Sequence, residues 1–533
     1  MAPTHWLLLL TSVALLLWRR KGRGKGLRLP LGPQGLPLIG NVLDFPTSHY
    51  GASFSKLREA YGGHVVHLKL FGQSVIVLNS YRAAVDLLEK RSANYSDRPR
   101  SVMAELVGYD DWVLVLMQYG QKWRQHRRAI FQLFHLDAIQ ELKPTLEMFA
   151  YNLLSDLDRT PAHFSEHIGF AVAKAAMRTV YGIQVTDPGD PCFHMAETIV
   201  YVGSAMSTPG AFRVDTFPIL RYLPSWFPGV GFKRLAAVWR ARTLSYRDQL
   251  FLAGKAALDR GVVNSLLGRV MGAVDAVDGS ASPGFNDTEE MCRGAAATAY
   301  AGGADTTHTA IHLFFLIMAT HKEAQAKAQA ELDSVIGSDR LPTFSDRTSL
   351  PFMNALIKEV LRWHVISPIG VAHRSVADDE YDGYLIPAGS IMIPNIWAMA
   401  RDESVYPDPE LFSPERFLIH GKIDPNVRDP ASFAFGFGRR ICPGLDFADA
   451  YLYIVFASVL HVFSIGPPLD EKGAPQPLAM KFVETSLTAR PEPFRCTIQP
   501  RSVQAAQLVR GLSVETSLPF TSNGGARRTA ATS

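Results

Sequence analysis

The chain has 533 residues, of which 47% are apolar and 20% are charged, so it holds enough apolar material for a large buried core, and global disorder is excluded. Its 54 basic and 50 acidic residues leave a net charge of +4, which is too small in a chain of this length for a nucleic-acid-binding protein. Four scattered cysteines without a Cys-x-x-Cys pair exclude a zinc ribbon and a disulfide scaffold.

The N-terminal segment has the pattern of a membrane anchor. Residues Trp6 to Trp18 are apolar and uncharged, and a basic cluster from Arg19 to Lys25 follows them. A cleaved signal peptide, which is the alternative, has its charges before the apolar run and a small-residue site after it, so we expect this segment to stay attached. The run is shorter than the ~20 residues of a perpendicular membrane-spanning helix, so residues Met1 to His5 have to lengthen it. The positive-inside rule places the rest of the chain in the cytosol.

The stretch Leu29–Pro37 contains prolines that fix the backbone and exclude a helix. Beyond Pro500 the residues are small, polar and largely aperiodic. We therefore divide the chain into an anchor (1–18), a basic and Pro-rich hinge (19–45), one large folded domain (46–500) and a disordered tail (501–533).

The first half of the folded domain begins with a hairpin and continues as helices. Alternating patterns at His64–Leu70 and Ser74–Leu78 flank a turn at Phe71–Gln73. Small and turn-forming residues at Leu267–Asp287 predict a surface loop. Between the hairpin and this loop, helical periodicity is found at Tyr81–Arg91, Gln121–Phe134, Leu142–Leu157 and Phe232–Leu258.

The second half opens with the longest predicted helix. Asp287 is its expected N-cap, Glu290 completes a capping box, and the helix runs to about Thr320. The fold is therefore expected to be mainly α with a small β subdomain. The later elements are helices at Phe352–Trp363 and Leu445–Leu460 and strands at Tyr384–Ile396 and near Met480–Thr497.

The long helix contains an unusual stretch, Ala301–Thr307. Gly302 and Gly303 in a helix interior cost about 1 kcal/mol each relative to alanine, and the close approach of a planar ligand explains that cost. The hydroxyl of Thr306 can open the helix by bonding to the preceding turn, and Asp305 beside it can relay protons. Such a pair suits oxygen activation, which needs delivered protons, but it also occurs on ordinary polar helix faces.

The next helix carries Glu359 and Arg362, an acid and a base three residues apart on an otherwise largely apolar segment. An exposed pair of this kind contributes only ~0.2 to 0.5 kcal/mol. A buried pair must belong to a fully bonded network, because it otherwise destabilises the fold.

The strongest chemical signal is the run Phe435–Gly444, in which Cys442 is surrounded by glycines and arginines. The glycines remove side-chain bulk and allow the backbone to approach a flat ligand. A helical pattern begins at Leu445, so Cys442 lies at a helix N-terminus, where the macrodipole and free amide groups stabilise a thiolate. A thiolate held in this way is a good iron ligand.

This run resembles the haem-binding signature of the cytochrome P450 family, Phe-x-x-Gly-x-Arg-x-Cys-x-Gly, with matches at Phe435, Gly438, Arg440, Cys442 and Gly444. The resemblance implies that Cys442 is the proximal thiolate ligand of haem b. It also implies that Phe435 packs against the ligand and that Arg440 pairs with a haem propionate.

Other motifs of the family follow in the same order. Asp305 and Thr306 occupy its acid and alcohol positions. Trp123 and Arg127, four residues apart on one helix face, match the positions that point to a haem propionate, and His373 is a weaker candidate for the same role.

Glu359, Arg362 and Arg416 match the buried charged triad of the family, whose role is structural. The resemblance extends from about Leu29 to Pro500, which makes residues 46–500 a haem-thiolate catalytic domain, and its wording is most similar to fungal microsomal members.

The resemblance implies a monooxygenase that inserts one atom of O2 into a lipophilic small molecule, in secondary metabolism or in xenobiotic oxidation. Electrons from NADPH would come through a separate cytochrome P450 reductase, with cytochrome b5 as a second candidate donor, because the chain has no convincing nucleotide-binding turn. Lys122, Arg124, Arg128 and Arg439 form either a docking patch for that donor or a solvated face. We expect a single-pass protein of the endoplasmic reticulum membrane that does not bind nucleic acid. The expected substrate contacts come from the region after Arg98, Met206–Phe227, Ile369–Val371 and Glu484–Thr488.

Two alternatives stay open at this point. One is a haem-thiolate isomerase or dehydratase that rearranges peroxides without external electrons, although such chemistry does not need the Asp305–Thr306 pair. The other is a non-enzymatic haem protein that senses or stores a ligand.

Overall fold

The computed structural model describes residues 27–207, 210–262, 264–275, 285–484 and 488–512. These residues form two compact units, the first comprising the chain up to Pro99 together with Ala372–Asn395, and the second comprising Arg100–Val371 and the chain from Ile396 onward. The sequence predicts a single folded domain. Its pattern does not reveal two units, because the two segments of the first unit lie far apart in the chain and no linker sequence marks a boundary. The predicted membrane anchor lies outside the described residues.

The first unit is built on a four-stranded sheet with the order β1-β2-β6-β3. β1 and β2 form the predicted hairpin, β6 is parallel to β2, and β3 is antiparallel to β6. The buried valines and isoleucines of β2 supply the core of the unit. Its elements are α2 (Tyr50–Tyr61), β1 (Val65–Leu70), β2 (Gln73–Leu78), α3 (Tyr81–Ala84), the π-helix η1 (Val85–Lys90), α4 (Ser92–Tyr95), β3 (His373–Arg374), β4 (Asp379–Tyr381), β5 (Tyr384–Ile386) and β6 (Ile391–Pro394).

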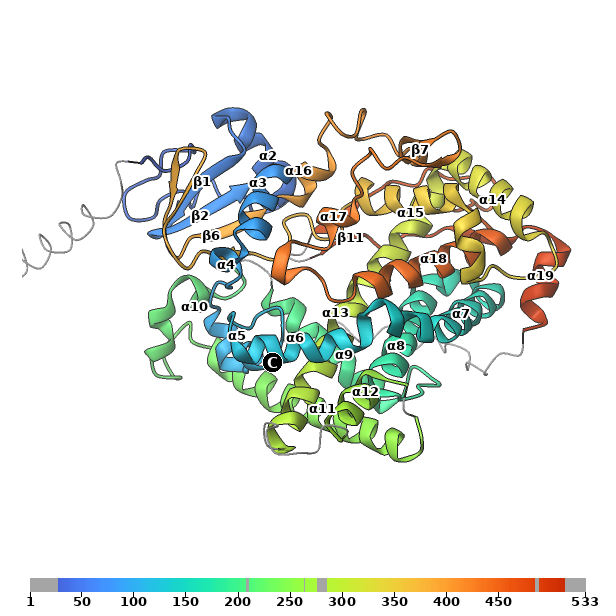
Figure 1. Cartoon of the computed structure of the whole chain (residues 1–533), viewed down its shortest axis with the longest axis horizontal. Helices are drawn as coiled ribbons and strands as arrows, with labels where there is room; N and C mark the ends of the chain where they lie inside the picture. Colours follow the sequence, from blue (N-terminus) through green and yellow to red (C-terminus); the bar gives the residue numbers. More distant parts are fainter. Residues whose placement is uncertain (1–26, 208–209, 263, 276–284, 485–487, 513–533) are drawn as a thin grey trace, which may run out of the picture. The chain divides into compact units, whose positions relative to one another are not determined.

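The second unit is mainly helical and is organised around α13, the helix Phe285–Thr320. α13 contacts α6, α8, α9, α15 and α18 (Figure 1). Its C-terminal half from Ala310 to Ala319 is buried on every face, as expected of a helix that is apolar all round. The stretch Ala301–Thr307 therefore lies on a helix that is fixed by packing on several sides.

The helices of the second unit are α5 (Val102–Val107), α6 (Gln121–Phe134), α7 (Leu136–Arg159), α8 (Phe164–Tyr181), α9 (Pro191–Met206), α10 (Arg213–Thr216), α11 (Phe232–Asp259), α12 (Leu266–Asp275), α13, α14 (Lys322–Ile336), α15 (Pro351–Trp363), α16 (Ile396–Ala400), α17 (Ala431–Ala434), α18 (Leu445–Val462) and α19 (Val503–Arg510). Its 3-10 helices are η2 (Tyr109–Asp111), η3 (Pro161–His163), η4 (Pro218–Tyr222), η5 (Phe344–Ser349), η6 (Pro414–Phe417) and η7 (Gly438–Arg440). Its short strands are β7 (Leu418–Ile419), β8 (Lys422–Ile423), β9 (Phe463–Gly466), β10 (Phe482–Glu484), β11 (Ala489–Pro491) and β12 (Thr497–Pro500).

Helix α18 is the one helix of the described residues that is long and apolar enough to cross a membrane. It is also 78% buried inside the protein, and it directly follows the run that contains Cys442.

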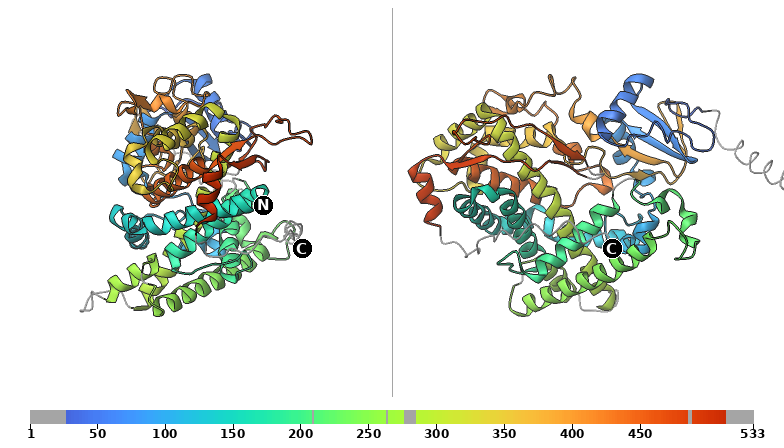
Figure 2. Two further views of the ribbon diagram at one scale, coloured as in Figure 1. Left: turned by 90° about the vertical axis from the view of Figure 1, so that its right-hand side faces the viewer. Right: turned by 180° about the vertical axis from the view of Figure 1, so that it is seen from behind.

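Two predictions of irregular structure are wrong. The segment predicted as a surface loop begins with α12, whose Leu266, Leu267 and Val270 are buried against neighbouring helices. The predicted disordered tail begins with α19, which packs on α7 and α18 (Figure 2). Both helices are rich in small residues, so their narrow apolar faces resembled loop sequence. The long helix α13 also begins at Phe285, two residues before the expected N-cap.

Candidate active site

The run around Cys442 forms a tight loop that ends at the N-terminus of α18. The backbone N–H of Cys442 donates to the carbonyl of Phe435 over 2.8 Å, which closes the loop. Gly436 and Gly438 have φ values of +81° and +56°, in the region that favours glycine, so the loop needs glycine at both positions. Gly444 is the N-cap of α18, and the helix begins at Leu445, as the sequence predicted.

The thiol of Cys442 is accessible and enclosed at the same time. Its side chain retains exposed surface, yet protein atoms surround it so closely that burial raises the pKa of the thiol. The backbone N–H of Gly444 and the charge of Arg127 lower this pKa, but burial has the larger effect. A bound metal cation would stabilise the thiolate of this sulfur against the cost of burial.

Trp123 and Arg127 of α6 lie next to this loop. The guanidinium of Arg127 donates to the carbonyl of Ile441 over 2.6 Å, one residue before the cysteine. The side chain of Trp123 is only 5% exposed, and its buried indole N–H has no hydrogen-bond partner among the described residues. The guanidinium of Arg440 stacks on the Trp123 ring, 4.5 Å from its centroid. The structure thus gathers the sulfur, two guanidinium groups and an unsatisfied donor.

Arg440 is also bound by protein carbonyl groups. Its guanidinium donates to the carbonyl oxygens of Leu114 and Met117, at 3.2 and 2.8 Å. These two bonds fix the orientation of the side chain against the stretch that precedes α6.

The glycine and threonine motif lies in the middle of α13. Thr306 is exposed, and its hydroxyl donates to the carbonyl of Gly302 over 2.7 Å. A side-chain Cβ placed on Gly302 or Gly303 would meet no atom of the described protein within 4 Å, so protein packing does not explain why these positions are glycine. Asp305 forms an ion pair with Arg490 at 3.8 Å. Sequence reasoning missed Arg490, because an isolated arginine so far along the chain belongs to no motif.

Glu359, Arg362 and Arg416 are brought together in a buried network. Both side chains of the Glu359–Arg362 pair are 0% exposed, and two hydrogen bonds of 2.7 Å join them. Arg416 donates to the same carboxylate over 3.2 Å, and the backbone N–H of Ser413 adds a bond of 2.8 Å. Helix α15, which carries the pair, contacts α17 directly ahead of Phe435. The helix that carries the network therefore contacts the segment that leads into the cysteine loop.

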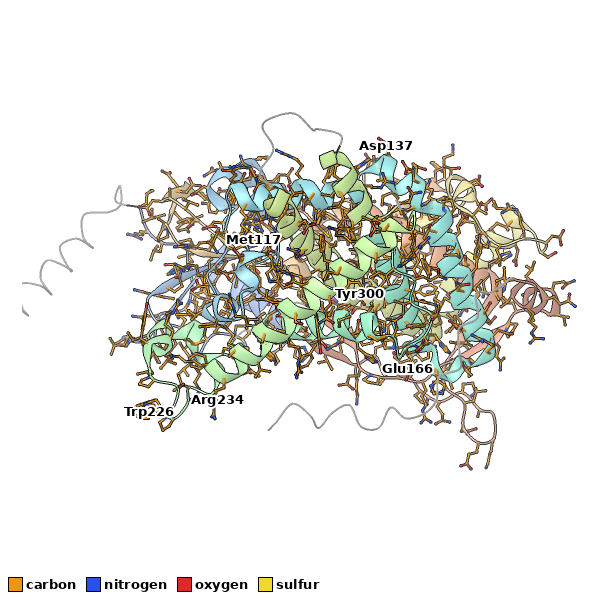
Figure 3. The ribbon with its side chains drawn as sticks, turned by 90° about the horizontal axis from the view of Figure 1, so that it is seen from below. Met117, Asp137, Glu166, Trp226, Arg234 and Tyr300 are labelled. Atoms are coloured by element: carbon orange, nitrogen blue, oxygen red, sulfur yellow. The ribbon has the colours of Figure 1, made fainter. Side chains whose placement is uncertain are left out.

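The remaining candidates are placed less favourably. His373 belongs to the first unit, where its ring nitrogen Nδ1 lies 2.7 Å from the carbonyl of Tyr95. In the segment expected to contact substrate, Ile219, Tyr222 and Trp226 are 70%, 77% and 79% exposed. Figure 3 shows Trp226 at the outer edge of the helical unit. These three side chains point to the surface and do not line an interior site.

The basic patch is only partly as expected. Arg124, Arg128 and Arg439 are exposed. Lys122 forms an ion pair with Asp111, which neutralises its charge.

The residues that the structure gathers fit a haem group. A planar, largely apolar macrocycle suits the glycine pair of α13, where no side chain intrudes. Its iron suits the accessible sulfur of Cys442, and its anionic propionates suit Arg127 and the unsatisfied indole N–H of Trp123. All of these residues belong to the second unit.

Comparisons with known proteins agree with this chemistry. The family model of cytochrome P450 matches residues 30–493. The chain is 39% identical over 482 residues to the cytochrome P450 monooxygenase COX2 of Coprinopsis cinerea, covering 90% of this chain and 91% of the relative. It is 38% identical to the cytochrome P450 monooxygenase claR of Ampulloclitocybe clavipes, covering 90% and 88%, and 36% identical to the cytochrome P450 monooxygenase ple1 of Rhodocybe pseudopiperita, covering 94% of each. These relatives come from basidiomycete fungi, which confirms the predicted fungal likeness. The chain belongs to the cytochrome P450 family and is an oxidoreductase of the monooxygenase class.

Proposed function

We propose that Cys442 holds the iron of haem b and that the enzyme inserts one oxygen atom of O2 into a lipophilic small molecule. The observation that carries this proposal is the accessible, enclosed sulfur of Cys442 beside Arg127 and the N-cap Gly444. Membership of the family implies a haem group with a cysteine thiolate ligand and the use of O2.

Arg127, Trp123 and Arg440 would hold the haem propionates, and His373 is a further candidate in the first unit. Haem supplies the redox centre at which O2 is activated. The protein supplies a fixed sulfur donor, because the loop from Phe435 to Cys442 is closed by a backbone hydrogen bond. The amide of Gly444 and the charge of Arg127 favour the thiolate form of that sulfur.

Asp305 and Thr306 would deliver the protons that oxygen activation consumes. Asp305 is 23% exposed and reaches toward solvent through Arg490, whereas the Thr306 hydroxyl lies on an exposed face of α13. A carboxylate that takes up protons and a hydroxyl that passes them on form a relay suited to this purpose.

Electrons would come from NADPH through a separate flavoprotein reductase, with cytochrome b5 as an additional donor. Arg124, Arg128 and Arg439 offer exposed positive charges for docking an acidic protein. The apolar run Trp6–Trp18 would anchor the enzyme in the endoplasmic reticulum membrane, with the folded units in the cytosol.

The test is reconstitution of the full chain with haem, a fungal cytochrome P450 reductase and a panel of lipophilic compounds. We expect a red-shifted Soret band in the ferrous carbon monoxide complex and NADPH-dependent oxygenation of those compounds that shift the ferric spin state. Turnover of lipid hydroperoxides with no need for NADPH or reductase would contradict the proposal.

A further inference from the structure

Asp305 is the acid of the α13 motif, and its carboxylate has one ion-pair partner among the described residues. That partner is Arg490 of β11, with 3.8 Å between its Nη1 atom and Oδ1 of Asp305. This distance is too long for a hydrogen bond, so the two charges attract each other without a rigid bond between them. The attraction between the two charges therefore favours orientations of the carboxylate that face Arg490.

Arg490 connects the acid with the protein surface. Its side chain is 45% exposed, whereas that of Asp305 is 23% exposed. The guanidinium is thus in contact with water on one side and with the acid of α13 on the other. Water can therefore reach Asp305 on the side where Arg490 lies.

The charge of Arg490 affects the pKa of a buried histidine in the helical core. His308, one turn beyond Asp305, has a lowered pKa, for which burial is the main cause. Asp305 and Glu166 of α8 raise this pKa, and Arg490 lowers it. His312, on the next turn of α13, stacks on the His308 ring with 5.7 Å between the ring centroids. Arg490 is therefore part of the electrostatic environment of the proposed relay.

The position of Arg490 is fixed by its strand. The amide of Ala489, the preceding residue, donates to the carbonyl of Ile366 over 2.7 Å, and Arg490 pairs with Val483 across the β10–β11 hairpin. His364 stacks on Phe482 of the same hairpin, with ring centroids 3.7 Å apart. The hairpin is thus tied to the segment that leads to Ile369–Val371, where substrate contacts are expected.

We infer that Arg490 is a positioning residue for the monooxygenase reaction, holding the carboxylate of Asp305 at the solvent end of the proton path in α13. This inference rests on the proposed function, because it needs Asp305 to relay protons. It also implies that the strand carrying Arg490 links proton delivery to the segment from Ile366 to Val371.

The first test needs no turnover. Hydrogen–deuterium exchange of the haem-loaded protein reports how firmly β11 is held, with Arg490→Gln, Asp305→Asn and the control Arg495→Gln compared with the parent. Arg495 is exposed, lies five residues away and forms no ion pair with Asp305 in the part of the chain that the structure describes. We expect peptides that contain Ala489 to exchange about two- to fivefold faster in both ion-pair variants, as for a partly exposed pair, and at the parental rate in the control. Parental exchange in both ion-pair variants would overturn the inference.

The second test measures how reducing power is divided between oxidised substrate and hydrogen peroxide. Arg490→Gln should lower the ratio of product to peroxide about two- to fivefold, and Arg490→Lys should restore most of it, because the charge returns. In an Asp305→Asn background the Arg490→Gln exchange should have no further effect, because Arg490 acts through that carboxylate.

Additive effects of the two exchanges, or a lysine variant no better than the glutamine variant, would overturn the inference. The outcomes separate the two proposals. If Asp305→Asn alters the ratio and Arg490→Gln does not, the inference fails and the proposed function stands. If the parent gives no thiolate spectrum and no NADPH-dependent product, both fail.

Discussion

The guanidinium of Arg362 donates two hydrogen bonds of 2.7 Å to the carboxylate of Glu359, and both side chains are completely buried. Arg362 also donates to the carbonyl groups of Ala400 and Pro409, at 3.0 and 2.8 Å. The pair therefore joins α15 to the segment that leads to Arg416. A buried charge in such a network stabilises the fold only while all of its partners are present.

Replacement of Glu359 by alanine should leave two arginines without their carboxylate and cost about 3–5 kcal/mol of unfolding free energy. We expect little haem-loaded protein from this variant. The matched control is Lys327→Ala, which removes a 57% exposed partner of Glu415 and should cost at most about 1 kcal/mol. Haem content and denaturant unfolding measure both variants, and a normal yield of haem-loaded Glu359→Ala would show that the network is dispensable.

Replacement of Cys442 by alanine should abolish the red-shifted Soret band of the ferrous carbon monoxide complex, because no other described thiol lies in the loop at the start of α18. Cys496→Ala is the control, since it removes a free cysteine elsewhere in the second unit. The optical spectrum of each reduced, carbon monoxide-treated variant decides the outcome. An unchanged band in Cys442→Ala would show that the ligand is misassigned.

The proposed relay predicts that Thr306→Ala binds haem normally but diverts electrons from substrate oxidation to the formation of hydrogen peroxide from O2. Product formation should fall roughly 10²- to 10⁴-fold, the range expected for loss of an acid–base group. Thr320→Ala serves as a control, because Thr320 bonds the preceding turn of the same helix in the same way. The quantities to measure are NADPH consumed, product and peroxide. If NADPH consumption in Thr306→Ala stayed tightly coupled to product formation, with no extra peroxide, the relay would be excluded.

A fourth prediction concerns acid stability. Burial lowers the pKa of His312 from 6.5 to about 3, with a further contribution from His308. Between these two pH values the unfolded chain binds a proton that the folded protein does not. Stability therefore falls as the pH drops below 6.5, by about 1.4 kcal/mol per pH unit for this residue.

His312→Leu should remove this dependence, so between pH 6.5 and 5 the variant should lose about 2 kcal/mol less than the parent. Denaturant unfolding at several pH values provides the measurement. Comparison above pH 7 is the internal control, because His312 is neutral there in both states. Parallel pH profiles of parent and variant below pH 6.5 would contradict the prediction.

Strongly periodic segments could be predicted from the sequence. Gln121–Phe134 has its predicted bounds, and α15 differs from prediction by one residue, because both helices carry a clear apolar stripe. The segments α12 and α19 could not be predicted in this way, since both helices are short and each carries only a narrow apolar face. Strands of two residues, such as β3, are too short to show any alternation.

The residues of the candidate site could be predicted only where they belong to a local sequence motif. Cys442 and its glycines form one continuous run, and Trp123 and Arg127 share one helix face. The ion pair of Asp305 with Arg490 depends on tertiary packing. The residues around Asp305 and those around Arg490 contain no pattern that predicts it. The outward orientation of Trp226 likewise depends on how the chain turns after α10, which periodicity does not report.

Helix α19 has a practical consequence for shortened versions of the enzyme. Its Ala505 and Val509 are buried against the core, and Arg510 forms an ion pair with Asp158 of α7. A truncation after Pro500 would expose the apolar surface that these side chains cover, and burying a valine-sized side chain is worth about 1.5–3 kcal/mol. Expression and crystallisation trials that remove the C-terminal residues should therefore keep the chain through Leu512.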